Sequence, residues 1–138
     1  MQPQFAKGLD HVAIAVKDLD AAIHYYVHVL GFAPPELEVV EEQKVKTAIF
    51  GHGMGRIELI CPTEPNTSVA KFLEKRGEGL HHICVEVADI VATLAELKAK
   101  GAQLIDEVPK IGAGGAKIAF VHPKGAHGVL TELRQGRP

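Results

Sequence analysis

Apolar and polar positions alternate in two segments of the chain that match each other. In residues 9–16 the apolar side chains at 12, 14 and 16 alternate with His11 and two alanines. This alternation is typical of a β-strand that has one apolar face. Residues 80–87 repeat the pattern, with His82 placed 71 residues after His11. An aspartate suited to capping a helix follows each segment, at Asp18 and Asp89. The chain therefore reads as a duplicated module that begins with a strand and a helix.

The rest of each copy predicts the same order of elements, namely a helix followed by three strands. In the first copy we expect a helix from Asp18 to about Leu30 and strands at about 36–41, 45–50 and 56–61. In the second copy we expect a helix at 89–100 and strands at about 102–107, 116–121 and 128–134. A short helix within about 66–77, capped by Thr67 or Ser68, links them. The sequence predicts an α+β fold of two tandem βαβββ modules, at about 9–62 and 80–134, in one domain covering 1–138.

Four polar side chains occupy matched places in the two copies: His11, Glu58, His82 and Glu132. Each histidine lies near the start of a first strand, and each glutamate lies within a last strand. If the first and last strands of a module pair, each histidine and glutamate share one face of a sheet, and two modules side by side would gather four ligands. Imidazole and carboxylate suit first-row divalent metals, and such a set leaves coordination positions open.

A structural interpretation of these four residues stays open. A single strand histidine is usually a hydrogen-bonded structural residue, and duplication copies structural residues as well as ligands. The small neighbours of His11 favour a site, because they leave space that a packed core would fill. Elsewhere, His24 and His28 are four residues apart on a helix and could bind metal, although a surface role is the simpler interpretation. Residues 112–115 form a glycine-rich loop before a strand, so they are no phosphate-binding loop.

The composition excludes several classes of function. The 138 residues are 46% hydrophobic and 23% charged, with a net charge of −2, so nothing favours binding to nucleic acid. No apolar run approaches the ~20 residues that a membrane helix needs, and the first residues lack a signal-peptide pattern. Cys61 and Cys84 are the only cysteines and form no Cys-x-x-Cys pair, which favours a reduced, cytoplasmic protein.

The chain resembles the methylmalonyl-CoA epimerases of the vicinal oxygen chelate, or glyoxalase-like, superfamily from about residue 9 to 133. The residues that carry the resemblance are 9–16, 70–82, 112–117, 122–124 and 128–133. The resemblance implies a curved mixed sheet around a metal cleft, with metal ligands at His11, His82 and Glu132 and a fourth at Glu58. It also implies a divalent ion, with Co²⁺ first and Mn²⁺, Ni²⁺ or Zn²⁺ as alternatives, an acyl-CoA substrate and a homodimer.

The implied reaction interconverts the 2R and 2S epimers of methylmalonyl-CoA in propionate, branched-chain or odd-chain catabolism. The resemblance therefore implies an isomerase, of class EC 5.1.99.1. A proton alpha to the thioester must leave one face and return to the other, so two bases are needed. The candidates are Glu132 and Glu42. The chain departs from the family pattern at Thr47, which stands about where some members have a base and cannot take a proton.

Two alternative functions remain open on the same fold. A lactoylglutathione lyase of the glyoxalase I type would use a similar metal set, although residues 122–124 and the glycine-rich loop argue against it. A metal-free ligand-binding protein is the other alternative. Measurements of metal content and assays with each substrate distinguish the epimerase from these two alternatives.

Overall fold

The computed structural model describes residues 5–136. It contains two compact units: a first unit of residues 11–81, and a second unit of residues 82–136 together with residues 5–10. Residues 1–4 and 137–138 of the expected domain lie outside the described residues. That the two modules form one domain stays a prediction.

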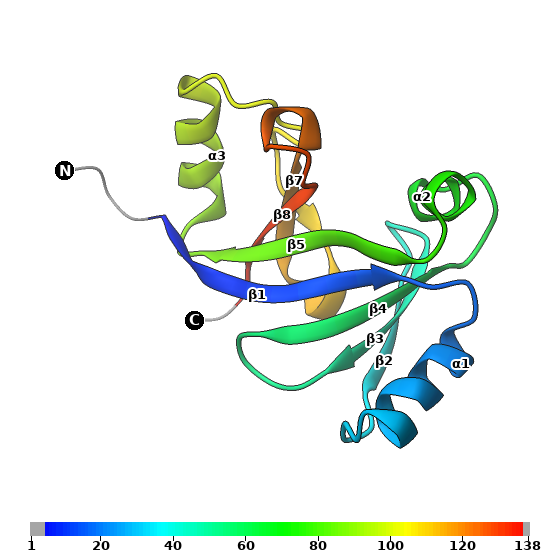
Figure 1. The fold of residues 1–138 in the computed structure, drawn as a ribbon. Coiled ribbons are helices and arrows are strands. Elements are labelled where there is room, and N and C mark those ends of the chain that lie inside the picture. The colour runs from blue at the N-terminus through cyan, green and yellow to red at the C-terminus, as the bar shows by residue number, and fades with distance from the viewer. Residues whose placement is uncertain (1–4, 137–138) are drawn as a thin grey trace. The chain divides into compact units, whose positions relative to one another are not determined.

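The first unit is a four-stranded mixed sheet with helices attached to it (Figure 1). Its strands lie in the order β2-β3-β4-β1, and β1 pairs with β4 in parallel while β2–β3 and β3–β4 are antiparallel. The elements are β1 (Ala6–Ala15, entering from the second unit), α1 (Leu19–His24), the π-helical turn η1 (Tyr25–Val29), β2 (Glu36–Val40), β3 (Val45–Phe50), β4 (Arg56–Pro62) and α2 (Ser68–Arg76).

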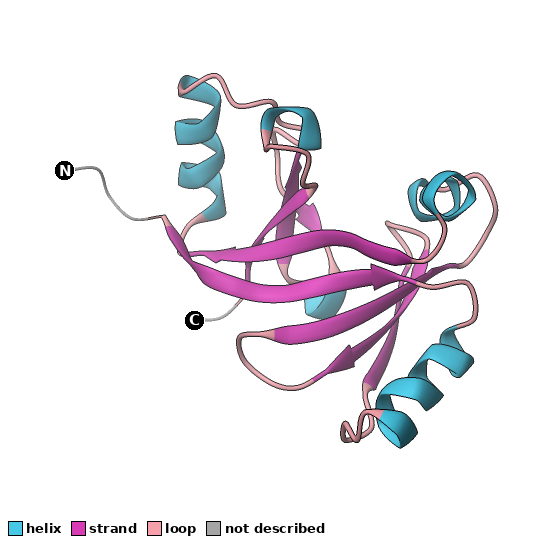
Figure 2. Ribbon diagram, viewed as in Figure 1, coloured by secondary structure: helices cyan, strands magenta, loops and turns pink. Residues whose placement is uncertain are grey.

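The second unit repeats this plan, and strands again make up most of its regular structure (Figure 2). Its strand order is β5-β8-β7-β6, with β5 and β8 parallel and the other pairs antiparallel. Its elements are β5 (Gly79–Val87), α3 (Ile90–Ala99), β6 (Lys110–Ile111), the 3₁₀ turn η2 (Ala113–Gly115), β7 (Lys117–Val121), the 3₁₀ turn η3 (Pro123–Gly125) and β8 (Thr131–Gln135). The predicted βαβββ order is confirmed in both modules.

One face of each sheet is apolar and packs against a helix. In the first unit Val16, Leu59 and Phe50 form a buried cluster with Leu19 of α1. In the second unit Val87, Leu133 and Ala119 do the same with Ile90 and Leu94 of α3. Because strand side chains alternate between faces, His11 and His82 lie on the opposite faces from these cores. The alternation seen in the sequence therefore decides which face carries the polar groups.

The predicted helix starts are confirmed by their caps. Asp18 and Asp89 each accept a hydrogen bond from the backbone N–H three residues later, at 3.1 Å in both cases. Thr67 caps α2 in the same way through Ala70. These bonds satisfy N–H groups that have no partner inside the helix, which is why Asp and Thr mark these starts.

The helix expected to run from Asp18 to Leu30 changes character after His24. From Tyr25 the chain forms a π-helical turn, closed by the Leu30 N–H donating to the Tyr25 carbonyl at 3.0 Å. Tyr26 stacks on Phe50 with ring centroids 5.4 Å apart. This aromatic packing against the sheet accompanies the wider turn, and helical periodicity alone gave no sign of it.

The strand expected at 102–107 is wrong. This segment contains only an isolated bridge between Leu104 and Val121, and the short strand β6 begins later. The Ile105 and Asp106 N–H groups both donate to the Phe120 carbonyl, while the Asp106 carboxylate accepts the Phe120 N–H at 2.9 Å. The Asp106 side chain therefore accepts the hydrogen bond that a backbone carbonyl would accept in a regular β-ladder, and this segment does not pair with β7 as a strand. Among residues 5–136, no helix is long and apolar enough to cross a membrane.

Candidate metal centre and active site

The first unit holds a buried histidine–glutamate pair. His11 lies on β1 and Glu58 on β4, and the parallel register places Glu58 opposite Ala13. His11 Nε2 lies 3.4 Å from Glu58 Oε1, and both side chains are more than nine-tenths buried. The small Ala13 leaves room for the two larger polar groups to meet. The expected pairing of first and last strands is confirmed, and it brings these residues together.

The second unit holds the matching pair, His82 on β5 and Glu132 on β8. Their register places Glu132 opposite Cys84, which is the counterpart of Ala13. His82 Nε2 and Glu132 Oε1 are hydrogen-bonded at 3.1 Å, and both side chains are buried. The Phe120 ring stands edge-on to the His82 ring, with centroids 5.4 Å apart. Phe120 is also directly opposite Glu132 on β7, so it limits movement of both members of the pair.

These pairs have the donor atoms and burial that a first-row divalent metal requires. Each offers an imidazole nitrogen and a carboxylate oxygen, and the carboxylate would be costly to bury without a compensating cation or hydrogen bond. The residues therefore fit a metal such as Co²⁺, Mn²⁺, Ni²⁺ or Zn²⁺, and their role as ligands stays a prediction.

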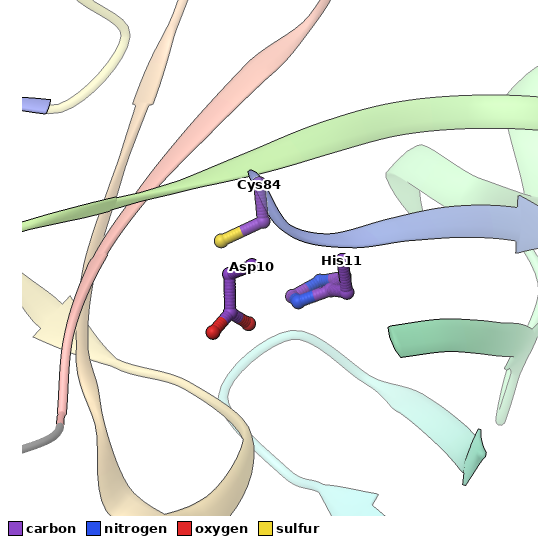
Figure 3. Close-up of side chains that lie close together, drawn as sticks. All are labelled: Asp10, His11 and Cys84. Atoms are coloured by element: carbon purple, nitrogen blue, oxygen red, sulfur yellow. The ribbon is translucent and has the colours of Figure 1, made fainter. Parts of the chain in front are cut away.

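The second unit adds charged groups that the sequence reasoning missed. Arg134 lies opposite Glu86 in the β5–β8 register, on the same face as Glu132. Its Nη1 lies 3.9 Å from an oxygen of Asp10 and 4.0 Å from an oxygen of Glu86. The Asp10 carboxylate and the Cys84 sulfur are within 4.8 Å of each other (Figure 3). Residue alternation on β5 already placed Glu86 on the His82 face, but only the strand register identifies Arg134 as its partner.

The first unit lacks this ion cluster at the corresponding positions. With the same 71-residue offset, the counterpart of Glu86 is Ala15, and with the 74-residue offset of Glu58 and Glu132, the counterpart of Arg134 is Ile60. Both Ala15 and Ile60 are buried. The His–Glu pair is thus common to both units, whereas the buried Asp10 and Glu86 and the partly buried Arg134 belong to the second unit.

The candidate second base, Glu42, lies apart from the pair in its unit. It is exposed in the turn of residues 41–44 between β2 and β3. On β4, Glu58 is four residues from Pro62, which pairs with Val45 at the β3 end of that turn, a separation of about 13 Å along the strand. Thr47 is buried on β3, and its hydroxyl donates to the Glu38 carbonyl at 3.3 Å. The catalytic role of Glu42 stays a prediction.

Other candidates from the sequence are placed as follows. His81 points away from His82 and packs edge-on against Phe72 of α2, with centroids 4.8 Å apart. His122 Nδ1 accepts the Lys124 N–H at 3.0 Å, which is a structural cap. In the glycine-rich loop, a Cβ added to Gly112 would lie 2.8 Å from the side chain of Ile118. Gly112 therefore allows this loop to pack closely on β7.

Comparisons with known proteins agree with this geometry. A sequence profile of the Glyoxalase/Bleomycin resistance protein/Dioxygenase superfamily matches residues 10–120, and the chain belongs to that superfamily. The ethylmalonyl-CoA/methylmalonyl-CoA epimerase of Cereibacter sphaeroides is 41% identical over 92% of this chain and 96% of its own. Within the superfamily, the chain falls in the methylmalonyl-CoA epimerase family and is an epimerase.

Solved structures give the same family and the same fold. The crystal structure of methylmalonyl-CoA epimerase from Mycobacterium tuberculosis matches with a TM-score of 0.92 and 36% identity, covering 100% of this chain and 93% of the other. A methylmalonyl-CoA epimerase in complex with methylmalonyl-CoA and NH4+ matches with a TM-score of 0.91 and 38% identity, covering 96% of each chain. The α+β glyoxalase fold expected from the sequence is confirmed.

Proposed function

We propose that this epimerase interconverts the 2R and 2S epimers of methylmalonyl-CoA, using one divalent metal ion held by His11, Glu58, His82 and Glu132. The observation that carries the proposal is the buried His–Glu pair repeated at corresponding positions of both modules, at 3.4 and 3.1 Å. The family relationship supports an acyl-CoA thioester as the substrate, and a relative has been solved with methylmalonyl-CoA bound.

The reaction depends on removing a proton alpha to a thioester. When bound, a divalent metal supplies Lewis-acid stabilisation of the negative charge that develops on the thioester oxygen. The chain's own residues orient the substrate and move the proton. Glu132 has a carboxylate oxygen beyond the one that meets His82, and we assign it as the base on one side of the carbon. Glu42 is the candidate that returns a proton to the other face, after movement of its turn or of the substrate.

Several finer features of the proposal follow the family. Co²⁺ is the first candidate for the metal, and Mn²⁺, Ni²⁺ and Zn²⁺ are alternatives. The enzyme is proposed to act in the cytoplasm as a homodimer, in propionate, branched-chain or odd-chain catabolism. Because a relative is described as acting on ethylmalonyl-CoA as well, the substrate range of this chain is part of the test.

The decisive experiment measures exchange of the alpha proton of methylmalonyl-CoA with solvent deuterium by the metal-loaded protein. His82→Ala is expected to abolish exchange and to lower the bound metal measured by elemental analysis, because one imidazole ligand is lost. His81→Ala is the matched control, since this neighbouring histidine packs on Phe72 instead, and it should keep both metal and exchange.

The alternatives give different results in the same assays. A lactoylglutathione lyase would leave methylmalonyl-CoA unchanged and would isomerise the adduct of methylglyoxal and glutathione. A metal-free binding protein would hold no divalent metal after reconstitution. Full exchange by the His82→Ala protein would remove His82 from the site.

A further inference from the structure

Three side chains that can bind metal lie four residues apart along the α1–η1 segment, outside the site described above. They are Asp20, His24 and His28, and all three are exposed. The imidazole rings of His24 and His28 are already adjacent, with centroids 4.6 Å apart and planes inclined by 38°. Two neighbouring imidazoles on one face form a pair that can bind a single ion through one nitrogen each.

The change of helix type comes directly after His24. In a regular α-helix each residue turns by about 100°, so a residue four positions later lies about 40° off the first. The wider π-helical turn of Tyr25–Val29 keeps His28 on the same side as His24, with the two ring centroids 4.6 Å apart. π-Helical turns recur at functional sites in helices, and here the turn begins immediately after the first histidine.

The three side chains also border one open hollow of about 360 Å³, which Val27, Pro34 and Pro35 line as well. Two consecutive prolines give that wall little conformational freedom. Asp20 contributes a carboxylate at the rim of the same hollow. The hollow is therefore open to water and is bordered by the two histidines and by one acidic residue.

We propose that His24 and His28 bind one borderline first-row divalent cation, with water completing the coordination and the Asp20 carboxylate adding negative charge at the rim of the same hollow. Imidazole pairs favour Cu²⁺, Ni²⁺ and Zn²⁺ over Mg²⁺ or Ca²⁺, and Cu²⁺ should bind most tightly. The site is separate from the His11–Glu58 pair, because α1 packs on the apolar face of the first unit's sheet, and that pair lies on the other face. It follows that the metal content of this protein can exceed one ion per chain.

Titration of the purified protein with CuCl₂ tests the site, followed by calorimetry and by electron paramagnetic resonance of the bound ion. The protein is first loaded with Co²⁺, and retained Co²⁺ is measured after each titration. We expect one further equivalent of Cu²⁺ with hyperfine coupling to two imidazole nitrogens. His24→Gln and His28→Gln should each weaken this binding by at least the roughly 10–100-fold that even an outer-shell change costs. Asp20→Asn should have a smaller effect.

The control variant is His52→Gln, which removes another exposed histidine of the same unit. It should leave the additional equivalent unchanged. Copper binding that is equally tight in wild type, His24→Gln and His28→Gln would overturn the proposal, as would a spectrum with one coordinated imidazole. Because the comparison rests on the difference between variants that keep His11 and His82, it holds whether or not Co²⁺ binds at the proposed catalytic site.

Discussion

At the scale of single residues, the candidate site contains polar side chains that occur in both copies of the duplicated module and others that occur only once. The sequence alone indicated His11, Glu58, His82 and Glu132, because duplication places them at matched positions. It did not indicate Asp10 or Arg134, because the contacts of Arg134 with Asp10 of β1 and Glu86 of β5 depend on strand register and tertiary packing, which no local pattern encodes. Glu42 was chosen from its neighbourhood in the sequence, and the structure places it in an exposed turn.

Glu42 can be tested directly by replacing its carboxylate with an amide. If Glu42 is the second base, Glu42→Gln lowers the rate of epimerisation by about 10²–10⁴-fold, the usual effect of losing a general base. Proton exchange from one epimer should persist, because Glu132 still acts on its own side. Glu41→Gln changes the adjacent exposed acid and should leave kcat unaltered. A Glu42→Gln enzyme with the wild-type rate would show that the second base is another group.

Cys61 offers a pH-dependent test of the first unit's packing. Burial raises the pKa of its thiol above the ordinary value of 9.0. A raised pKa means less thiolate at a given pH below it, so alkylation by iodoacetamide should be slower in the native protein than in urea. The rate of Cys61 alkylation should also begin to rise at a higher pH in the native protein than in the urea-unfolded protein. Peptide mass spectrometry can follow Cys61 separately from the buried Cys84, and coinciding pH profiles in the two states would contradict this assignment.

At the scale of elements, the sequence was most informative where one residue type controls a backbone feature. Asp18, Thr67 and Asp89 mark helix starts, since a side-chain oxygen must satisfy the first N–H groups. The prediction of a strand at 102–107 was wrong. The apolar content of this segment resembles that of a strand, but the Asp106 side chain accepts the Phe120 N–H that a paired strand would bind. β8 likewise begins later than expected, at Thr131, because His127 and Gly128 turn the chain with positive φ angles of 55° and 86°.

The two duplicated caps give a matched prediction. Asp18→Ala and Asp89→Ala each remove one hydrogen bond of the same length, 3.1 Å, and should each reduce the free energy of unfolding by about 1 kcal/mol. Urea denaturation monitored by circular dichroism measures both. Asn at either position retains an oxygen acceptor, so Asp18→Asn and Asp89→Asn should stay close to wild type. A loss in the Asn variants equal to that in the Ala variants would mean that the cap bond is not the cause.

At the scale of the whole molecule, the duplication allows residues at corresponding positions of the two copies to be compared. Both compact units keep the His–Glu pair, but only the second unit has the buried carboxylates of Asp10 and Glu86 beside the partly buried Arg134. The first unit has Ala15 and Ile60 in the places of Glu86 and Arg134. Buried ion clusters seldom add net stability over apolar residues of similar size. The first unit folds with apolar residues at the two corresponding places.

Arg134→Met tests how strongly that cluster constrains the second unit. Removing the cation leaves the Asp10 and Glu86 carboxylates buried without it, so we expect the free energy of unfolding to fall by about 3–5 kcal/mol. Lys117→Met, an exposed cation on the neighbouring strand β7, should change it by less than about 0.5 kcal/mol. Equal urea midpoints for the two variants would mean that water already screens Arg134.

The irregular segment before β6 has a protective consequence for the second unit. Without residues 102–107, the backbone N–H and C=O of Phe120 would be unpaired at the edge of β7, where a strand of another molecule could form hydrogen bonds with them. Asp106 and its neighbours already occupy both groups. Covered sheet edges and charged side chains at an edge disfavour edge-to-edge pairing between molecules, and this segment provides both at Phe120.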